Sequence, residues 1–162
     1  MQELYEGIEL DETQTEWICR GLLDLASADG LHPSEIELIE GFATAGGRGS
    51  TSIEQLKGKG FDVDEAKAVL GSSPQLTEAF LVSCYLLIYA DGRHSDEERA
   101  RVGSYADALG VERTALEDLH VRARLYLLSM LAQGLRNKDA VRAVGIHQLG
   151  LKADQIASLV ED

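Results

Sequence analysis

Apolar side chains recur along most of this chain at the three- and four-residue spacing of an amphipathic helix, and strand-like alternation is nowhere sustained. Pro33 and Pro74 stand where helices would begin, because the first helical position needs no backbone N–H donor. The expected helices cover about residues 15–28, the apolar segments that follow Pro33 and Pro74, 53–56, 62–71, 95–110, 114–135, 137–144 and 153–160. The pattern therefore predicts an all-α helical bundle, with the very apolar stretch 114–135 as its central helix.

One short motif occurs twice, each time between two apolar stretches. ADGLHPSE begins at Ala28, and ADGRHSDEE begins at Ala90. Before the motif, the apolar faces align residue by residue, with Ile18 on Phe80 and Leu22 on Cys84. After it, the faces align only if the first loop is one residue shorter, which places Ile39 on Val102 and Glu35 on Glu98. An ungapped alignment would place Glu35 on Glu97, but buried helix faces tolerate such slippage poorly.

Each copy therefore predicts a helix, an Asp-Gly corner and a second helix. Gly30 and Gly92 can adopt the positive φ that ends the first helix. The Asp closes one helix and the Glu lies in the first turn of the next, so the two carboxylates of each corner should lie close together. We expect a single domain over residues 1–162, with repeats at about 13–45 and 74–110 and further helices over 111–162.

The paired Asp-Gly corners, each between two apolar helices, resemble the signature of the TerB-like family. That all-α family takes its name from a bacterial tellurite-resistance protein and includes the N-terminal domain of a membrane-anchored DnaJ-type co-chaperone. The resemblance covers roughly residues 13–110, and it implies a function in stress response or in tellurite and metal resistance. It also implies that the Asp and Glu of each corner chelate a metal. In this sequence these acids are Asp29, Glu35, Asp91 and Glu98.

The residues before each acidic turn bear on which metal would bind. The family usually has an apolar residue followed by Ser or Thr there, whereas this chain has His32-Pro33 and His94-Ser95. Carboxylate ligands alone would suit Ca²⁺ or Mg²⁺. If His32 and His94 are also ligands, the preference moves toward Zn²⁺, Mn²⁺ or Fe²⁺. An EF-hand is excluded, because its first loop position would fall on Leu25 or Leu87.

A purely structural interpretation of the corners stays open beside the metal site. Asp before Gly is common in turns, and a Glu at the third helical position completes a capping box and favours the helix dipole. In that case this protein would be an acidic helical interaction module without a metal. A third hypothesis, a carboxylate-bridged hydrolase or redox centre, would require the two corners to converge and to leave an open coordination position.

Charge and hydropathy limit the classes of partner. The formal net charge is −13, and the first forty residues contain eleven acids against one base, Arg20. Such a chain is not drawn to nucleic acid or to anionic lipid. A basic protein surface or a second copy of the chain, forming a homodimer, is the natural partner.

The chain offers no sign of membrane insertion, secretion or catalysis. It has no run of eighteen apolar residues and no secretory signal pattern at its start, so we expect no membrane insertion and a cytoplasmic location. Cys19 and Cys84 lie in apolar stretches and are expected to be buried thiols. No catalytic set is visible, and we expect no enzyme activity.

Overall fold

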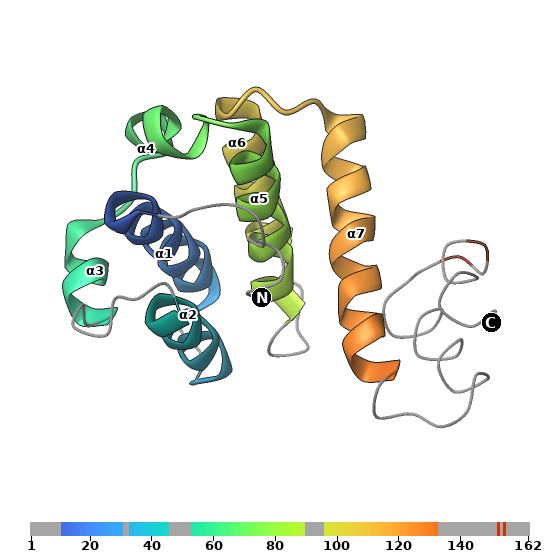
Figure 1. Ribbon diagram of the computed structural model, residues 1–162, viewed down its shortest axis with the longest axis horizontal. Helices are drawn as coiled ribbons and strands as arrows, with labels where there is room; N and C mark the ends of the chain where they lie inside the picture. Colours follow the sequence, from blue (N-terminus) through green and yellow to red (C-terminus); the bar gives the residue numbers. More distant parts are fainter. Residues whose placement is uncertain are drawn as a thin grey trace. The chain divides into compact units, whose positions relative to one another are not determined.

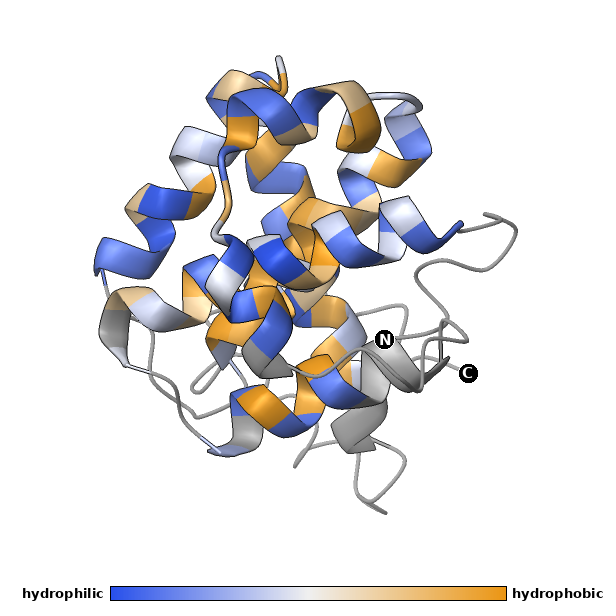
Figure 2. Ribbon diagram, turned by 90° about the vertical axis from the view of Figure 1, so that its left-hand side faces the viewer, coloured by the Kyte–Doolittle hydropathy of each residue, from blue (hydrophilic) through white to orange (hydrophobic). Residues whose placement is uncertain are grey.

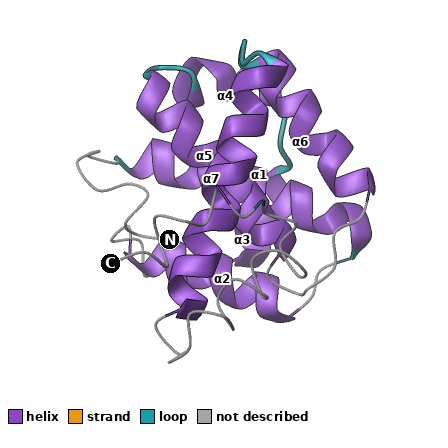
Figure 3. Cartoon of the chain, turned by 90° about the vertical axis from the view of Figure 1, so that its right-hand side faces the viewer, coloured by secondary structure: helices purple, strands orange, loops and turns teal. Residues whose placement is uncertain are grey.

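The computed structural model describes residues 11–30, 33–45, 53–89, 96–132, 152 and 154. Within these ranges every regular element is a helix and no strand occurs, which confirms the all-α class (Figure 3). The chain divides into two compact units, Met1–Leu116 and Glu117–Asp162. The two units are described separately below.

The first unit is built around helix α1. Its described elements are α1 (Glu12–Ala26), the 3₁₀ turn η2 (Ser27–Asp29), α2 (Pro33–Ala45), α3 (Ile53–Lys59), α4 (Val63–Leu70), α5 (Pro74–Tyr89) and α6 (Asp96–Ala108). Helix α1 packs against α2, α3, α4 and α5, and Figure 1 shows it lying between α3 and α5. Helix α6 packs against α5 and also contacts α1, α4 and η2.

Local sequence signals determine where these helices start. Helices α2 and α5 begin at Pro33 and Pro74, as predicted, and the hydroxyl of Ser73 accepts a bond of 3.1 Å from the N–H of Leu76. Helix α1 begins earlier than the apolar spacing predicts. The reason is a capping box, in which Asp11 accepts from the N–H of Gln14 at 2.7 Å and Gln14 accepts from the N–H of Asp11 at 3.0 Å.

Helix α5 is the most buried helix of the first unit. Apart from exposed Glu78, every residue from Leu76 to Ile88 is buried. Figure 2 shows hydrophobic and hydrophilic positions mixed along the helices, as expected for helices with one solvent-exposed face. Over residues 113–129 of α7 (Arg113–Ala132), three side chains are buried: Leu119, Ala123 and Leu128.

Helices α1 and α5 approach closely at Gly21. A Cβ atom built on Gly21 would lie 2.7 Å from Cζ of Phe80 and 3.2 Å from Cε2 of Phe61. The Phe61 ring also meets Trp17 and Tyr105 edge to face, at centroid distances of 6.1 and 5.3 Å. The rings of Phe80 and Phe61 therefore occupy the space beside Gly21, and Trp17 and Tyr105 pack around the Phe61 ring.

Hydrogen bonds from Arg20 connect α1 to the end of α3. Its Nε donates to the carbonyl of Gly60 at 2.7 Å, and its Nη2 donates to the carbonyl of Lys59 at 3.2 Å. Gly60 has φ +70°, the left-handed conformation that commonly ends a helix. The guanidinium also lies 3.9 Å from the centre of the Trp17 ring. One side chain thus satisfies carbonyl oxygens that the end of a helix leaves without intrahelical partners.

The described part of the second unit is the body of α7, which begins at the end of the first unit, together with residues 152 and 154. The helices expected over 137–144 and 153–160 fall almost entirely outside the described residues. Among the described helices, none combines the length and apolar character that crossing a membrane requires.

Candidate functional site

The first helix corner is formed by the end of α1, the turn η2 and the start of α2. Helix α1 ends at Ala26, and η2 continues the chain to Asp29. Gly30 follows with φ +81°, the positive value expected from the Asp-Gly sequence. The second corner connects α5, which ends at Tyr89, to α6, which begins at Asp96. Gly92, at the second corner, lies outside the described residues.

The structure describes the side chains of two of the six predicted metal ligands, Glu35 and Glu98. Asp29 is described only as the last backbone position of η2. The remaining three predicted ligands lie outside the described residues: His32, Asp91 and His94. Among the residues with described side chains, no cluster of three or more His, Cys, Asp or Glu could hold a metal ion. The six-residue site therefore stays a prediction.

Glu35 and Glu98 occupy equivalent places in the two copies. Each is the third residue of its helix, α2 from Pro33 and α6 from Asp96, and each is only 2% exposed. Glu97, the alternative partner in the ungapped alignment, is exposed. The structure therefore agrees with the alignment that shortens the first loop by one residue.

Burial of a carboxylate carries an energetic cost that a helix cap alone does not require. A capping glutamate needs to reach only its own helix terminus, and it can do so at the surface. A carboxylate taken out of water must be compensated by hydrogen bonds, an ion pair or a metal ion. Glu35 and Glu98 each have an interaction partner in the structure. Their oxygen atoms are nevertheless the donor type that a hard divalent cation prefers.

A polar cluster that the sequence did not reveal connects α1 to α6. This Asp24 cluster consists of Asp24, Arg101 and Tyr105. Arg101 Nη1 donates to the main-chain carbonyl of Asp24 at 2.7 Å and lies 3.6 Å from the Oδ2 atom of the same residue. The Tyr105 hydroxyl donates to that Oδ2 atom. The Ser27 hydroxyl, in η2, donates to the same Asp24 carbonyl at 2.8 Å.

The surroundings of the cluster perturb two weak acids. Burial raises the pKa of the Tyr105 hydroxyl far above its ordinary value, and the hydrogen bond to Asp24 raises this pKa further. Burial also raises the pKa of the Cys84 thiol, and the negative charge of Asp24 adds to that shift. Both groups are therefore uncharged in the folded protein at neutral pH, and neither is an activated nucleophile.

One signal for this cluster was present in the sequence. Asp24 interrupts the apolar run Leu22, Leu23, Leu25 and Ala26 near the end of α1, and its side chain is only 32% exposed. A partly buried carboxylate at such a place needs a hydrogen-bond donor from another part of the chain. The donors lie 77 and 81 residues away in the chain, however, so the helical pattern does not identify them.

Comparisons with protein-family models, with curated proteins and with solved structures found no match for this chain.

Proposed function

We propose that this protein is a TerB-like cytoplasmic module that binds a divalent metal ion at its two Asp-Gly/Glu corners and acts in stress response or in tellurite or metal resistance. The observation that carries the proposal is the matched burial of Glu35 and Glu98, each 2% exposed at the third position of its helix. Binding, rather than catalysis, is the proposed activity.

The comparison with neighbouring glutamates supports a specific role for these two carboxylates. Glu37 on α2 and Glu97 on α6 are exposed, so burial is not a general property of acids on these helix turns. In both repeats, the glutamate at the third position of the second helix is buried. A buried carboxylate must be compensated by hydrogen bonds, an ion pair or a cation, and the cation-binding role is the proposal that this shared burial supports.

The proposed ion depends on the histidines. With Asp29, Glu35, Asp91 and Glu98 as ligands, the oxygen donors suit Ca²⁺ or Mg²⁺. With His32 and His94 added, the mixed oxygen and nitrogen donors suit Zn²⁺, Mn²⁺ or Fe²⁺. The identity of the ion that stabilises the protein would therefore report whether the imidazoles take part.

Thermal unfolding of chelator-treated protein tests the proposal, with Ca²⁺, Mg²⁺, Mn²⁺ and Zn²⁺ added one at a time. At a hundredfold excess over Kd, a ligand stabilises the folded state by about 2.7 kcal/mol, which is roughly 5–10 °C in Tm for a chain of this size. Glu35→Gln, Glu98→Gln, Asp29→Asn and Asp91→Asn should lose this response. Glu37→Gln and Glu97→Gln are matched controls and should keep it. If no ion shifts the Tm of the wild-type protein, the metal-binding proposal is wrong.

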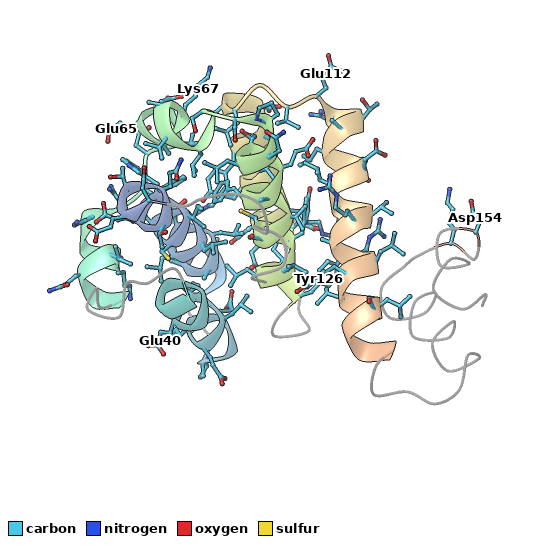
Figure 4. All side chains as sticks on the ribbon, in the orientation of Figure 1. Glu40, Glu65, Lys67, Glu112, Tyr126 and Asp154 are labelled. Atoms are coloured by element: carbon cyan, nitrogen blue, oxygen red, sulfur yellow. The ribbon has the colours of Figure 1, made fainter. Side chains whose placement is uncertain are left out.

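A second candidate function, an acidic interaction module with purely structural corners, is favoured by a different observation. Acidic side chains on several helices of the first unit are exposed, and Figure 4 shows Glu40 of α2 and Glu65 of α4 pointing away from their helices. Such a surface would suit a basic protein partner or a basic region of a second copy. Under this alternative, no metal would change the Tm. Charge reversal at Glu12, Glu40 and Glu65 would weaken self-association measured by sedimentation at low salt, or binding to a basic polypeptide such as polylysine.

A further inference from the structure

The Asp24 cluster joins two helices that belong to different repeats. Asp24 lies on α1, the first helix of the first repeat, whereas Arg101 and Tyr105 lie on α6, the second helix of the second repeat. Arg101 Nη1 donates to the main-chain carbonyl of Asp24 at 2.7 Å and lies 3.6 Å from its Oδ2 atom. The Tyr105 hydroxyl donates to the same Oδ2 atom. The cluster is therefore a polar contact of one repeat with the other.

The apolar faces of the helices do not distinguish the two repeats. Equivalent positions are apolar and buried in both copies: Ile18 and Phe80, Leu22 and Cys84, Ile39 and Val102. The first helices of the two repeats, α1 and α5, also pack against each other. A second molecule offers the same faces again, so a repeat could pair with its equivalent in another copy. Exchange of equivalent elements between copies is a common route to dimers.

The Asp24 cluster distinguishes the repeats because its residues are not duplicated. In the alignment of the two copies, Asp24 corresponds to Leu86, Arg101 to Leu38 and Tyr105 to Phe42. If two first repeats paired in the same way, each Asp24 would face apolar side chains in place of its two donors. If two second repeats paired, each Arg101 would face a leucine in place of a carboxylate. Either pairing would set a charge against an apolar side chain without compensating hydrogen bonds, at a cost in free energy.

We infer that the Asp24 cluster determines which repeats pair, by favouring the contact between α1 and α6 of one chain over the pairing of equivalent repeats from two copies. A protein selects one partner by contacts with that partner and by penalties against the others, and the cluster supplies both. Leu38, the equivalent of Arg101, is half-buried, so an apolar residue can occupy this place in a repeat. The polar residues of the cluster therefore specify the pairing and are not needed to pack a single repeat.

Relocation of the arginine from one repeat to the other tests this inference. The full-length variant Arg101→Leu with Leu38→Arg keeps the net charge and places the base where the Asp24 of a second copy would meet it in an equivalent contact. The variant is unfolded in urea, refolded over a series of protein concentrations and examined by sedimentation velocity. Chelator excludes metal bridges, and moderate salt weakens contacts between exposed charges. The Kd of its dimer should be at least about 10-fold lower than that of the wild type.

Two further variants control for the change of composition. Arg101→Leu with Ala68→Arg has the same net charge, but its new base lies at an exposed position on α4. It should dimerise at least about 10-fold more weakly than the relocated variant. Addition of Asp24→Asn to the relocated variant removes the charge that the new base would meet. Its dimer should therefore be as weak as that of the control.

Three results would overturn the inference. They are an equal Kd for the dimers of the relocated variant and the control, a dimer that keeps its affinity after Asp24→Asn, and a wild-type dimer as tight as that of the relocated variant. Should the relocated variant not refold, Asp24→Leu with Arg101→Leu decides. It should dimerise more strongly than the wild type, because pairing of equivalent repeats no longer sets a charge against an apolar side chain, and an unchanged Kd would contradict the inference. None of these results changes the metal-binding proposal, which is tested by the Tm.

Discussion

Tyr105 on α6 donates the hydrogen of its hydroxyl to the Oδ2 atom of Asp24 on α1, across 81 residues of sequence. The tyrosine ring is 4% exposed, and the Asp24 side chain is 32% exposed. The bond therefore joins a buried phenol to a carboxylate that still reaches solvent. The contact links α6 of the second repeat to α1 of the first, in addition to the packing of α1 against α5.

Removal of the Tyr105 hydroxyl should destabilise the first unit. Tyr105→Phe leaves the Asp24 carboxylate with one donor fewer, and the loss should be about 1–2 kcal/mol because the carboxylate is partly solvated. Urea unfolding followed by circular dichroism measures it. In a double-mutant cycle with Asp24→Ala, the two losses should add up to more than the loss in the double variant. Simple additivity would show that the hydroxyl and the carboxylate do not interact.

The free energy of unfolding should fall at alkaline pH because of the titration of Tyr105. The pKa of Tyr105 is raised in the folded state above the ordinary tyrosine value of 10.0, so the phenol of the unfolded chain loses its proton first. Its contribution to stability is complete below about pH 10 and is lost progressively as the pH rises further, by about 1.4 kcal/mol per pH unit. Tyr105→Phe should therefore show a flatter decline of the free energy of unfolding above pH 10 than the wild type.

A second alkaline effect should come from Cys84 and should start at a lower pH. Burial raises the pKa of this thiol well above its ordinary value of 9.0, so the unfolded chain loses that proton first as well. The thiol's contribution is present below about pH 9 and declines above it. Cys84→Ala should flatten the stability profile from pH 9 upward, whereas Tyr105→Phe should flatten it only from pH 10. Identical profiles for the wild type and Cys84→Ala would contradict the expected thiol titration.

The elements of the fold were predictable where the signal is local. Pro33, Pro74 and Gly71 mark helix boundaries through their own backbone chemistry, and helical periodicity needs only a dozen neighbouring residues to be visible. The extent to which each helix is buried was harder to predict from the sequence. The apolar stretch near the end of the 114–135 segment suggested a buried helix, but Glu117, Asp118 and Arg122 earlier in α7 lie exposed, and such a helix keeps a solvent-facing side.

The candidate site likewise combines features that the sequence predicts with features that depend on tertiary packing. The equivalence of Glu35 and Glu98 follows from aligning two repeats, because a one-residue slip would expose an apolar face. Arg101 and Tyr105 could not be assigned to Asp24 from the sequence, since a pairing across 77 or 81 residues depends on how the helices pack.

Gly21 should tolerate no side chain. In Gly21→Ala the new methyl group would lie 2.7 and 2.8 Å from ring atoms of Phe80, inside contact distance, so the α1–α5 packing must shift. The expected loss is about 1–3 kcal/mol of the free energy of unfolding, measured in urea. Gly103→Ala on α6 is the matched control, because a Cβ there meets no atom within 4 Å. It should be neutral or stabilising by up to about 1 kcal/mol, since alanine favours the helix.

A compensating substitution checks the cause of the Gly21 effect. If the clash with the Phe80 ring is responsible, Phe80→Leu should cost less in the Gly21→Ala background than in the wild type, because the smaller side chain leaves room for the methyl group. An equal cost in both backgrounds would place the strain elsewhere, at the Phe61 ring, which lies 3.2 Å from the same position.

Arg20 should contribute more to stability than an ordinary surface arginine. Its side chain is 11% exposed, and its replacement by Gln would remove the donors for the carbonyls of Gly60 and Lys59 and the contact with the Trp17 ring. We expect Arg20→Gln to cost about 1–2 kcal/mol. Arg99→Gln, at an exposed position on α6, should change stability by less than about 0.5 kcal/mol. Because the two carbonyls close α3, amide hydrogen exchange in α3 should accelerate in Arg20→Gln more than exchange in α5, and uniform acceleration of both helices would contradict a local anchor.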